Sequence, residues 1–205
     1  LTIEGTGFSV SDVDEADSGA IATMSVGEGA LTIVEGDSGV TVTGGNGSST
    51  VTLSGTINQI NDLLTGAGTG TISYQTNSDT PSASTTLTVT VNDQGNVGAD
   101  PGLSGDGSSE EGSNSITINL TAINDDPTNV GSLPSDVTVV EDVVSDVDLS
   151  SIILSDVDAA AGHLTVTLTT ATGGHLTAAT SGGVTVTGSG GTALTLTGAL
   201  SDLNT

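Results

Sequence analysis

The chain has 205 residues, of which 25 are Asp or Glu, two are His and none is Lys or Arg, so its formal net charge is −25. Nucleic acids and anionic membrane surfaces bind proteins through Lys and Arg, and this composition argues against both as partners. No apolar run reaches membrane-spanning length, and the lack of Cys excludes disulfides and thiolate metal sites. Cations are the partners that suit such a chain.

Small aliphatic residues, Thr, Ser and Gly dominate the sequence, with one Phe, one Tyr and no Trp. Val and Thr favour strands, whereas Gly marks turns. We therefore predict an all-β fold of the β-sandwich type, with Phe8 and Tyr74 as core residues.

In chain order, alternating apolar and polar residues predict strands that are separated by Gly-, Asn- and Ser-rich turns. These strands are expected at residues 50–55, 70–75, 85–92, 115–122 and 136–140. Residues 56–64 instead carry Ile57, Ile60, Leu63 and Leu64 at helical spacing and predict a single helical turn. The polar, Gly-rich residues 92–114 predict a long loop.

The sequence contains an internal repeat: residues 8–62 are similar to residues 152–205. Ser-Asp-Val-Asp and Gly-Val-Thr-Val-Thr-Gly recur with an offset of 144 residues, and the last aligned stretch recurs with an offset of 143. A period of this length indicates a string of whole domains. We expect one repeat at 1–123, a linker at 124–128 and a second repeat at 129–205, both cut from a longer protein with further copies.

The linker carries Asn124, Asp125 and Asp126 and is stiffened by Pro127. Asp156 and Asp158 follow 31 and 33 residues after Asp125, and an extended Asp-x-Asp pair points both carboxylates to one side. Calcium takes six to eight oxygen ligands from such groups. These five residues are candidate calcium ligands, although Asp and Asn are also common in turns.

The same Asp-x-Asp pair occurs at Asp12 and Asp14. We predict a second, incomplete calcium site there, because its linker partner would lie upstream of Leu1. Glu141 and Asp142 could add to a further calcium site, but a solvated strand end is the simpler reading.

The end of a cadherin-type repeat resembles two stretches of this chain: residues 87–96, and residues 115–127, which end in Asn-Asp-Asp-Pro. Residues 57–75 look more like the cadherin-like repeats of giant bacterial surface adhesins. The resemblance implies tandem Ig-like β-sandwiches that bind Ca²⁺ between domains. The implied function is a structural spacer in an extracellular, cell-surface adhesion protein, whose partners are neighbouring repeats and possibly other copies. Two departures, Ala122 in place of an acid and a missing mid-repeat acidic motif near Asp79, predict fewer ions per site.

Other functions fit the sequence less well. A subunit of a self-assembling filament, surface layer or matrix fibre is the alternative. The stretch 35–40 is similar to the Gly-Asp-Ser-Gly of trypsin-like proteases, but the only possible bases, His163 and His175, lie in the other repeat. The two His side chains could also bind a transition metal, yet exposed strand residues are the better reading. Glycosidase and carbohydrate-binding sites need aromatic platforms that are nearly absent, so we predict no enzymatic activity.

Overall fold

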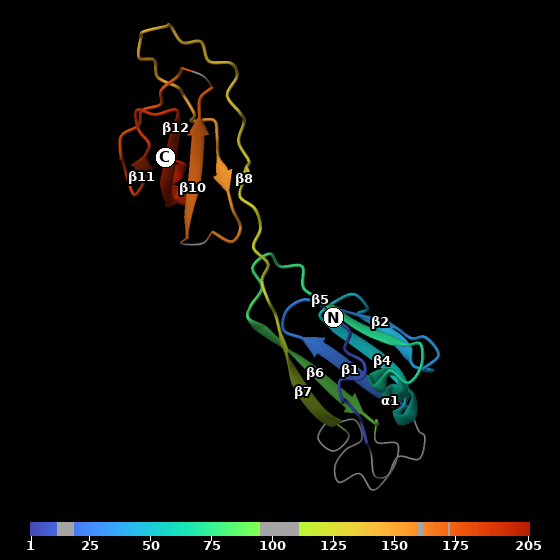
Figure 1. Ribbon diagram of the computed structural model, residues 1–205. Coiled ribbons are helices and arrows are strands. Elements are labelled where there is room, and N and C mark those ends of the chain that lie inside the picture. The colour runs from blue at the N-terminus through green and yellow to red at the C-terminus, as the bar shows by residue number, and fades with distance from the viewer. Residues whose placement is uncertain (12–18, 95–110, 160–161, 172) are drawn as a thin grey trace. The chain divides into compact units, whose positions relative to one another are not determined.

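The computed structural model describes residues 1–11, 19–94, 111–159, 162–171 and 173–205 (Figure 1). Most elements are strands in antiparallel sheets, which confirms the all-β prediction. The chain divides into two compact units, residues 1–122 and 123–205. The predicted calcium ligands Asp12 and Asp14 lie outside the described residues.

Unit 1 contains a five-stranded sheet in the order β3-β4-β1-β6-β7 and a two-stranded sheet of β2 and β5. Its strands are β1 (Gly19–Val26), β2 (Ala30–Val34), β3 (Thr41–Gly44), β4 (Thr50–Thr56), β5 (Thr71–Gln75), β6 (Ser84–Asn92) and β7 (Glu111–Asn119). β1 is central, because it pairs with β4 along one edge and with β6 along the other.

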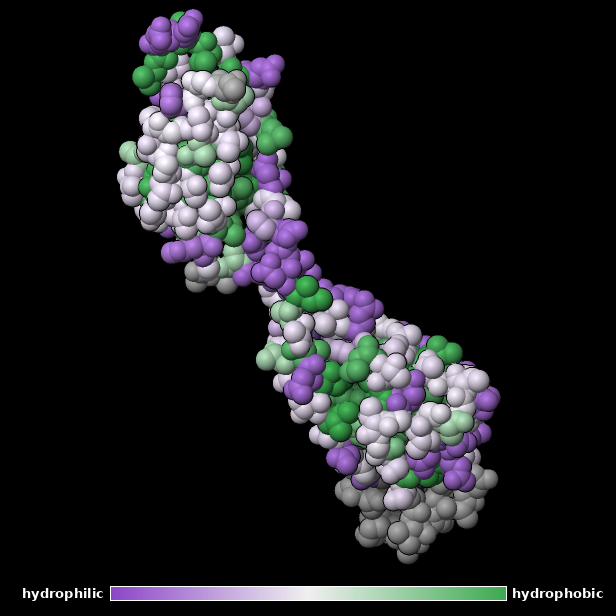
Figure 2. Space-filling view, in the orientation of Figure 1, coloured by the Kyte–Doolittle hydropathy of each residue, from purple (hydrophilic) through white to green (hydrophobic). Residues whose placement is uncertain are grey.

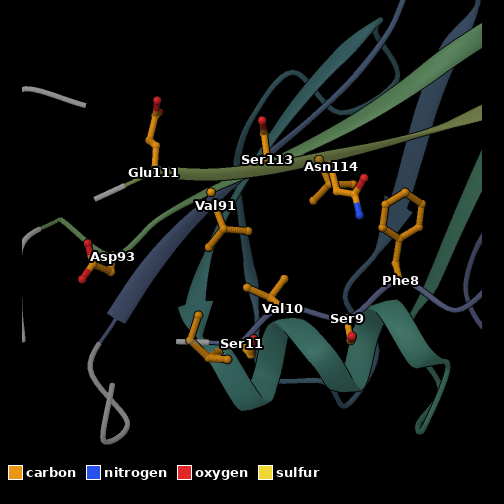
Figure 3. Close-up of a pocket in the computed structure, with 12 residues that line it drawn as sticks. Phe8, Ser9, Val10, Ser11, Val91, Asp93, Glu111, Ser113 and Asn114 are labelled. Atoms are coloured by element: carbon orange, nitrogen blue, oxygen red, sulfur yellow. The ribbon is translucent and has the colours of Figure 1, made fainter. Parts of the chain in front are cut away.

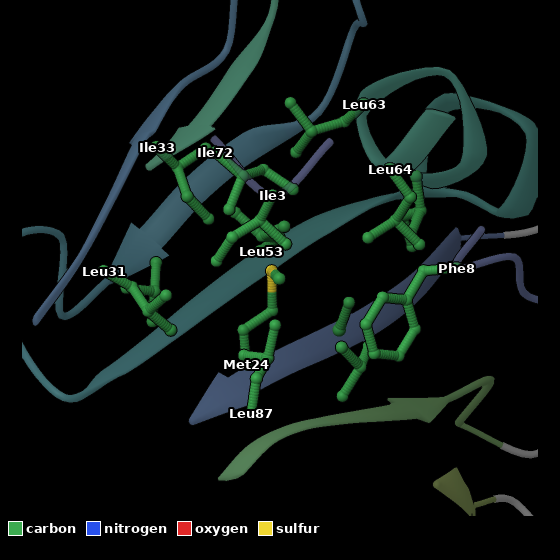
Figure 4. Close-up of a cluster of buried hydrophobic side chains, with 14 of the residues drawn as sticks. Ile3, Phe8, Met24, Leu31, Ile33, Leu53, Leu63, Leu64, Ile72 and Leu87 are labelled. Atoms are coloured by element: carbon green, nitrogen blue, oxygen red, sulfur yellow. The ribbon is translucent and has the colours of Figure 1, made fainter. Parts of the chain in front are cut away.

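The core of unit 1 lies between these two sheets (Figure 4). The alternation of the strands sends every second side chain inward, as in β1, where Ala20, Ala22 and Met24 are at most 2% exposed. Phe8 and Tyr74 are both buried, which confirms their predicted place in the core. The largest fully buried side chains are Met24, Leu31, Leu53, Ile60, Leu63, Leu64, Ile72, Leu87 and Val51.

The predicted helical turn is a nine-residue helix, α1 (Ile57–Thr65), and is therefore longer than expected. Its four apolar residues are all buried. Thr56 and Gln59 form a capping box, and Gly66 ends the helix in the left-handed conformation. Both ends of α1 thus have a sequence signal.

Two predictions of strand and loop positions are wrong. β7 begins at Glu111, so residues 111–114 belong to a strand and not to the predicted loop, because they pair with the end of β6. Residues 136–140 form no strand, and Val137, Val139 and Val140 are about half exposed or more. Alternation alone does not make a strand where no neighbouring strand pairs with it.

Unit 2 contains a three-stranded sheet in the order β10-β12-β11 and a short pair of β8 and β9. Its elements are β8 (Thr128–Asn129), β9 (Leu154–Ser155), β10 (His163–Thr169), β11 (Thr185–Thr187), β12 (Ala193–Ala199) and α2 (Leu200–Leu203). Among its described hydrophobic residues, Leu194 alone is buried. Unit 2 therefore has a much smaller core than unit 1.

Each unit contains the same pair of side-chain-to-backbone hydrogen bonds, at matching positions of the internal repeat. The Asn61 side chain accepts from Val10 N and donates to Val10 O, and the Asn204 side chain does the same with Leu154, each over 2.8–3.0 Å. These pairs are related by offsets of 143 for Asn and 144 for its partner. In unit 1 the Asn61 side chain ties α1 to the irregular segment that precedes β1, and in unit 2 the Asn204 side chain, at the end of α2, binds β9.

The change of offset from 144 to 143 has a local cause. The pairing of β3 with β4 shifts register between Val42 and Gly44, whereas β11 pairs with β12 without a shift. Unit 1 thus carries one extra residue in a β-bulge. After the bulge, Gly45 and Gly188 both have positive φ at the start of the following turn.

Candidate cation-binding site

The acidic segment at the start of unit 2 lies against the Asp-x-Asp turn. The backbone N–H of Asp125 donates to Oδ2 of Asp158 over 2.5 Å. Thr128 and Asn129 in β8 pair antiparallel with Ser155 and Leu154 in β9. Since these pairs flank both acidic stretches, the short β8–β9 ladder holds residues 124–126 beside residues 156–158.

Asp156 shapes the turn that follows β9. Its Oδ1 accepts from the backbone N–H groups of Asp158 and Ala159, each over 2.9 Å. Asp156 and Asp158 are half-buried, whereas Val157 between them is exposed, in keeping with an alternation of sides. The turn role expected of Asp is therefore present, and both bonds use only one oxygen of Asp156.

The linker side chains remain accessible. Asn124, Asp125 and Asp126 are all exposed, and the Asn124 amide donates to Asp125 O over 2.9 Å. Hydrophilic residues gather over this part of the surface in the space-filling view (Figure 2). Four carboxylates on two adjacent segments repel one another in a chain without Lys or Arg. A bound cation would relieve that repulsion.

Oxygen is the only donor type that these five residues offer, and hard oxygen ligands suit Ca²⁺ and Mg²⁺ rather than zinc or copper. In the described parts of the chain, no three acidic or His side chains converge closely enough to form a ready-made metal centre. A cation here would take its remaining ligands from backbone carbonyls, the Asn124 amide and water, as Ca²⁺ commonly does.

Other carboxylates are held by neutral donors. Asp37 accepts from the N–H and hydroxyl of Thr69, and these hydrogen bonds lower the pKa of Asp37. The backbone N–H of Ser82 and its side chain lower the pKa of Glu28. The side chain and N–H of Ser150 lower the pKa of Asp148. The chain therefore stabilises these isolated charges with N–H and O–H groups.

Tyr74 carries a buried hydroxyl that makes no hydrogen bond within the part of the chain that the structure describes. Burial, and then the negative charge of Glu28, raise the pKa of Tyr74. The hydroxyl therefore stays protonated, and the ring serves as packing in the core.

A pocket of about 350 Å³ opens at one end of unit 1 (Figure 3). Asp93 and Glu111 lie at one end of the view and Phe8 at the other, with Val10 and Val91 between them. Sugar-cleaving sites need a carboxylate pair on a ring-binding platform. The pocket does not place its aromatic side chain beside its carboxylates.

The protease-like stretch forms a turn. The hydroxyl of Ser38 donates to Glu35 O over 2.6 Å, and Ser38 is 6% exposed. A serine nucleophile needs a His base within hydrogen-bond reach, and Ser38 is engaged with its own turn instead. Its side chain therefore closes the turn that leads into β3.

The remaining candidates are two His residues and an acidic pair, all in unit 2. His163 starts β10 and is exposed, and Nδ1 of His175 lies 3.0 Å from Gly190 O. Glu141 and Asp142 occupy an exposed turn in which Asp142 has a φ of 62°. Their predicted place just after a strand is wrong, because residues 136–140, directly before them, form no strand.

Sequence reasoning missed the structural role of Asn61 and Asn204. Asn occurs at both aligned positions of the internal repeat, and this was the available signal.

No helix in the described ranges combines the length and apolarity needed to span a membrane. No protein-family model, curated protein or solved structure matches the chain.

Proposed function

We propose that the chain is a pair of tandem cadherin-like β-sandwich repeats that act as a spacer in a large extracellular surface or adhesion protein. Calcium, bound by Asn124, Asp125, Asp126, Asp156 and Asp158, would stiffen the segment where the second repeat begins. The observation that carries the proposal is the hydrogen bond from Asp125 N to Asp158 Oδ2, which joins the two acidic stretches.

The matched hydrogen bonds of the two units support the tandem arrangement. Asn61 and Asn204 bind equivalent backbone positions, and the Asn46 and Ser189 side chains bind the backbone of Ile33 and Ala178 in the same way. A fold repeated along the chain would suit a structural spacer.

Calcium would act on the start of unit 2 through charge and through coordination. An ion held by both acidic stretches cancels their mutual repulsion and fixes residues 124–126 to the turn after β9. Pro127 already limits the backbone of the same segment. Fewer conformations of this segment mean less freedom for one repeat to turn relative to the next.

The test is the thermal stability and scattering of the chain with calcium and with a chelator. Calcium at about a hundredfold excess over its dissociation constant adds about 2.7 kcal/mol to the stability of the unit that binds it. Chelation should therefore lower the melting temperature of unit 2 and make the chain more compact or more flexible by small-angle scattering.

Two substitutions sharpen this test. Asp156→Ala should mimic chelation, but it also removes the acceptor of the turn, so Asp158→Asn is the milder companion. Asp136→Asn removes one charge from an exposed position of the same unit and is the matched control. A melting temperature that changes neither with calcium nor with chelator would rule out the calcium part of the proposal.

A further inference from the structure

The edge of β2 that faces away from β5 is closed by the turn between β3 and β4. Two backbone hydrogen bonds of 2.8 Å join the turn to Leu31: Gly47 N donates to Leu31 O, and Leu31 N donates to Ser48 O. The Asn46 side chain adds two more, because its Oδ1 accepts from Ile33 N over 2.8 Å and its Nδ2 donates to Ile33 O over 2.9 Å. These four hydrogen bonds, here called the edge clasp, take the place of a neighbouring strand.

Unit 2 contains an edge clasp of the same form. Gly190 N donates to Leu176 O, and Leu176 N donates to Gly191 O. The Ser189 hydroxyl accepts from Ala178 N over 3.3 Å and donates to Ala178 O over 3.2 Å. Ser189 thus stands where unit 1 has Asn46. The clasp therefore needs a side chain that both donates and accepts, and it does not need an amide.

The amide of Asn46 brings a reaction that Ser189 cannot undergo. Asn46 and Gly47 form the only Asn-Gly pair in the chain. When hydroxide removes the proton of Gly47 N, the nitrogen can bond to Cγ of Asn46, and Nδ2 leaves as ammonia after taking up protons from water. Water then opens the resulting five-membered imide at either carbonyl and gives aspartate or isoaspartate. The net change is one water consumed and one ammonia released.

The closed clasp keeps both reacting groups occupied. Leu31 O holds the N–H of Gly47, and Ile33 holds both polar atoms of the Asn46 amide. Asn46 is exposed and a Cβ on Gly47 would meet open space, so water and hydroxide can reach the turn once it opens. Each hydrogen bond that must break lowers the open population about fivefold. The folded chain should therefore deamidate at least about a hundredfold more slowly than the unfolded chain.

We propose that Asn46 is a latent deamidation site, whose reaction requires the β2 edge to open and then keeps that edge from closing fully. Aspartate lacks the amide donor, so one carboxylate oxygen would face Ile33 O, and the two acceptors repel each other. Isoaspartate adds a carbon to the backbone of the turn, which takes Gly47 and Ser48 out of register with Leu31. The product is thus a permanent mark of a unit 1 that has opened.

The first experiment follows deamidation of the full chain at slightly alkaline pH, with and without denaturing guanidinium, by mass spectrometry of proteolytic fragments. Asn77 is the internal reference, because it is exposed, lies in an irregular segment and precedes Ser78. In the unfolded chain Asn46 should react faster than Asn77, since Gly has no side chain to hinder the attacking nitrogen. In the folded chain this order should reverse.

A second experiment measures the effect of the product by hydrogen exchange. Asn46→Asp should speed exchange of the Leu31 and Ile33 amides about tenfold or more, because it removes one hydrogen bond of the clasp and adds a repulsion. Asn77→Asp adds the same charge to unit 1 and should leave this exchange unchanged. Asn46→Ser, which copies Ser189, should keep exchange slow and abolish the reaction at this position.

Three results would overturn the proposal. They are equal deamidation of Asn46 in the folded and unfolded chain, no preference for Asn46 over Asn77 in the unfolded chain, and unchanged exchange of Leu31 and Ile33 in Asn46→Asp. None of these outcomes depends on calcium, so they are distinct from a failure of the proposed function.

Discussion

Several carboxylates in this chain, which contains no Lys or Arg, are stabilised by neutral hydrogen-bond donors. Asp37 shows how. It binds two groups of Thr69 from a turn 32 residues away, and thereby joins the loop before β3 to the loop before β5. Such bonds favour the charged form of the acid and make its protonation costly to the fold.

Asp37 predicts a pH dependence. Its pKa is lower in the folded chain, so it stabilises the fold above its unfolded pKa and loses this effect as the pH falls through the folded value. The melting temperature of unit 1 should be higher for the wild type than for Asp37→Asn at neutral pH. This gap should shrink below about pH 4.

Asp79→Asn is the control, since it removes the same charge from an exposed position of unit 1. Relief of overall repulsion on acidification is common to all three proteins and cancels from the comparison. A gap for Asp37→Asn that stays constant from neutral pH to pH values well below 4 would contradict the role of its hydrogen bonds.

Asn61 gives a second test at this scale. Asn61→Ala leaves the N–H and C=O of Val10 without their partner, and we expect a loss of roughly 1–3 kcal/mol in the free energy of unfolding of unit 1. Asn58→Ala, at an exposed position of the same helix, is the control and should cost less. Urea denaturation measures both losses. Equal losses would argue against a stabilising role for the two hydrogen bonds between Asn61 and Val10.

At the scale of residues, the sequence predicted which side chains are buried better than which side chains bind one another. Phe8, Tyr74 and the apolar face of α1 follow from periodicity alone. The contacts of Asp37 with Thr69 and of Asn61 with Val10 join positions 32 and 51 residues apart, and no local pattern encodes them. The spacing of Asp125 and Asp158 was accessible only because the internal repeat marked the boundary.

The turn between β3 and β4 is the clearest element-level constraint. Gly45 and Gly47 both have positive φ, which costs other residues about 1–2 kcal/mol. A Cβ on Gly45 would also collide with Thr50 O, whereas one on Gly47 would meet open space. A substitution at Gly47 therefore adds conformational strain alone, whereas one at Gly45 adds strain and a steric clash.

We predict that Gly45→Ala destabilises unit 1 by clearly more than Gly47→Ala, whose loss should be about 1–2 kcal/mol. Chemical denaturation of the two variants measures the difference. Similar losses would mean that the hairpin relaxes around the added methyl group. Gly188→Ala should repeat the larger effect in unit 2, where the new Cβ would meet Ala193 O.

Strand positions were predictable where alternation and a partner coincide, as in β4, β5 and β6. Residues 136–140 also alternate and yet form no strand, because a strand needs a neighbouring strand to pair with and none of the described strands pairs with this segment. Residues 111–114 are polar and yet extend β7, since β6 offers them an edge. Sheet order depends on contacts between distant residues, which a single sequence does not display.

On the scale of the whole molecule, the net charge of −25 opposes compaction. The Debye length falls from about 30 Å at 0.01 M salt to about 8 Å at 0.15 M, so salt should screen most of this repulsion. We expect the melting temperatures of both units to rise over this range of NaCl. Sucrose at matched osmolarity is the control, and a melting temperature independent of salt would contradict the expectation.

Specific cation binding must be separated from this general screening. Many carboxylates of the chain attract Ca²⁺ weakly, but a coordinated ion depends on named oxygens. The acidic segment 124–126 and the turn at 156–158 are the part of the described surface where the backbone holds two acidic stretches together. Substitutions there should act differently from substitutions at other acids.

The most direct test is a calorimetric titration of Ca²⁺ into the chain in about 0.15 M NaCl, where diffuse charge effects are screened. The wild type and Asp136→Asn should show the same saturable binding, and Asp156→Asn and Asp158→Asn should each weaken or abolish it. Binding that is absent from the wild type, or that survives both substitutions unchanged, would contradict calcium coordination at this site.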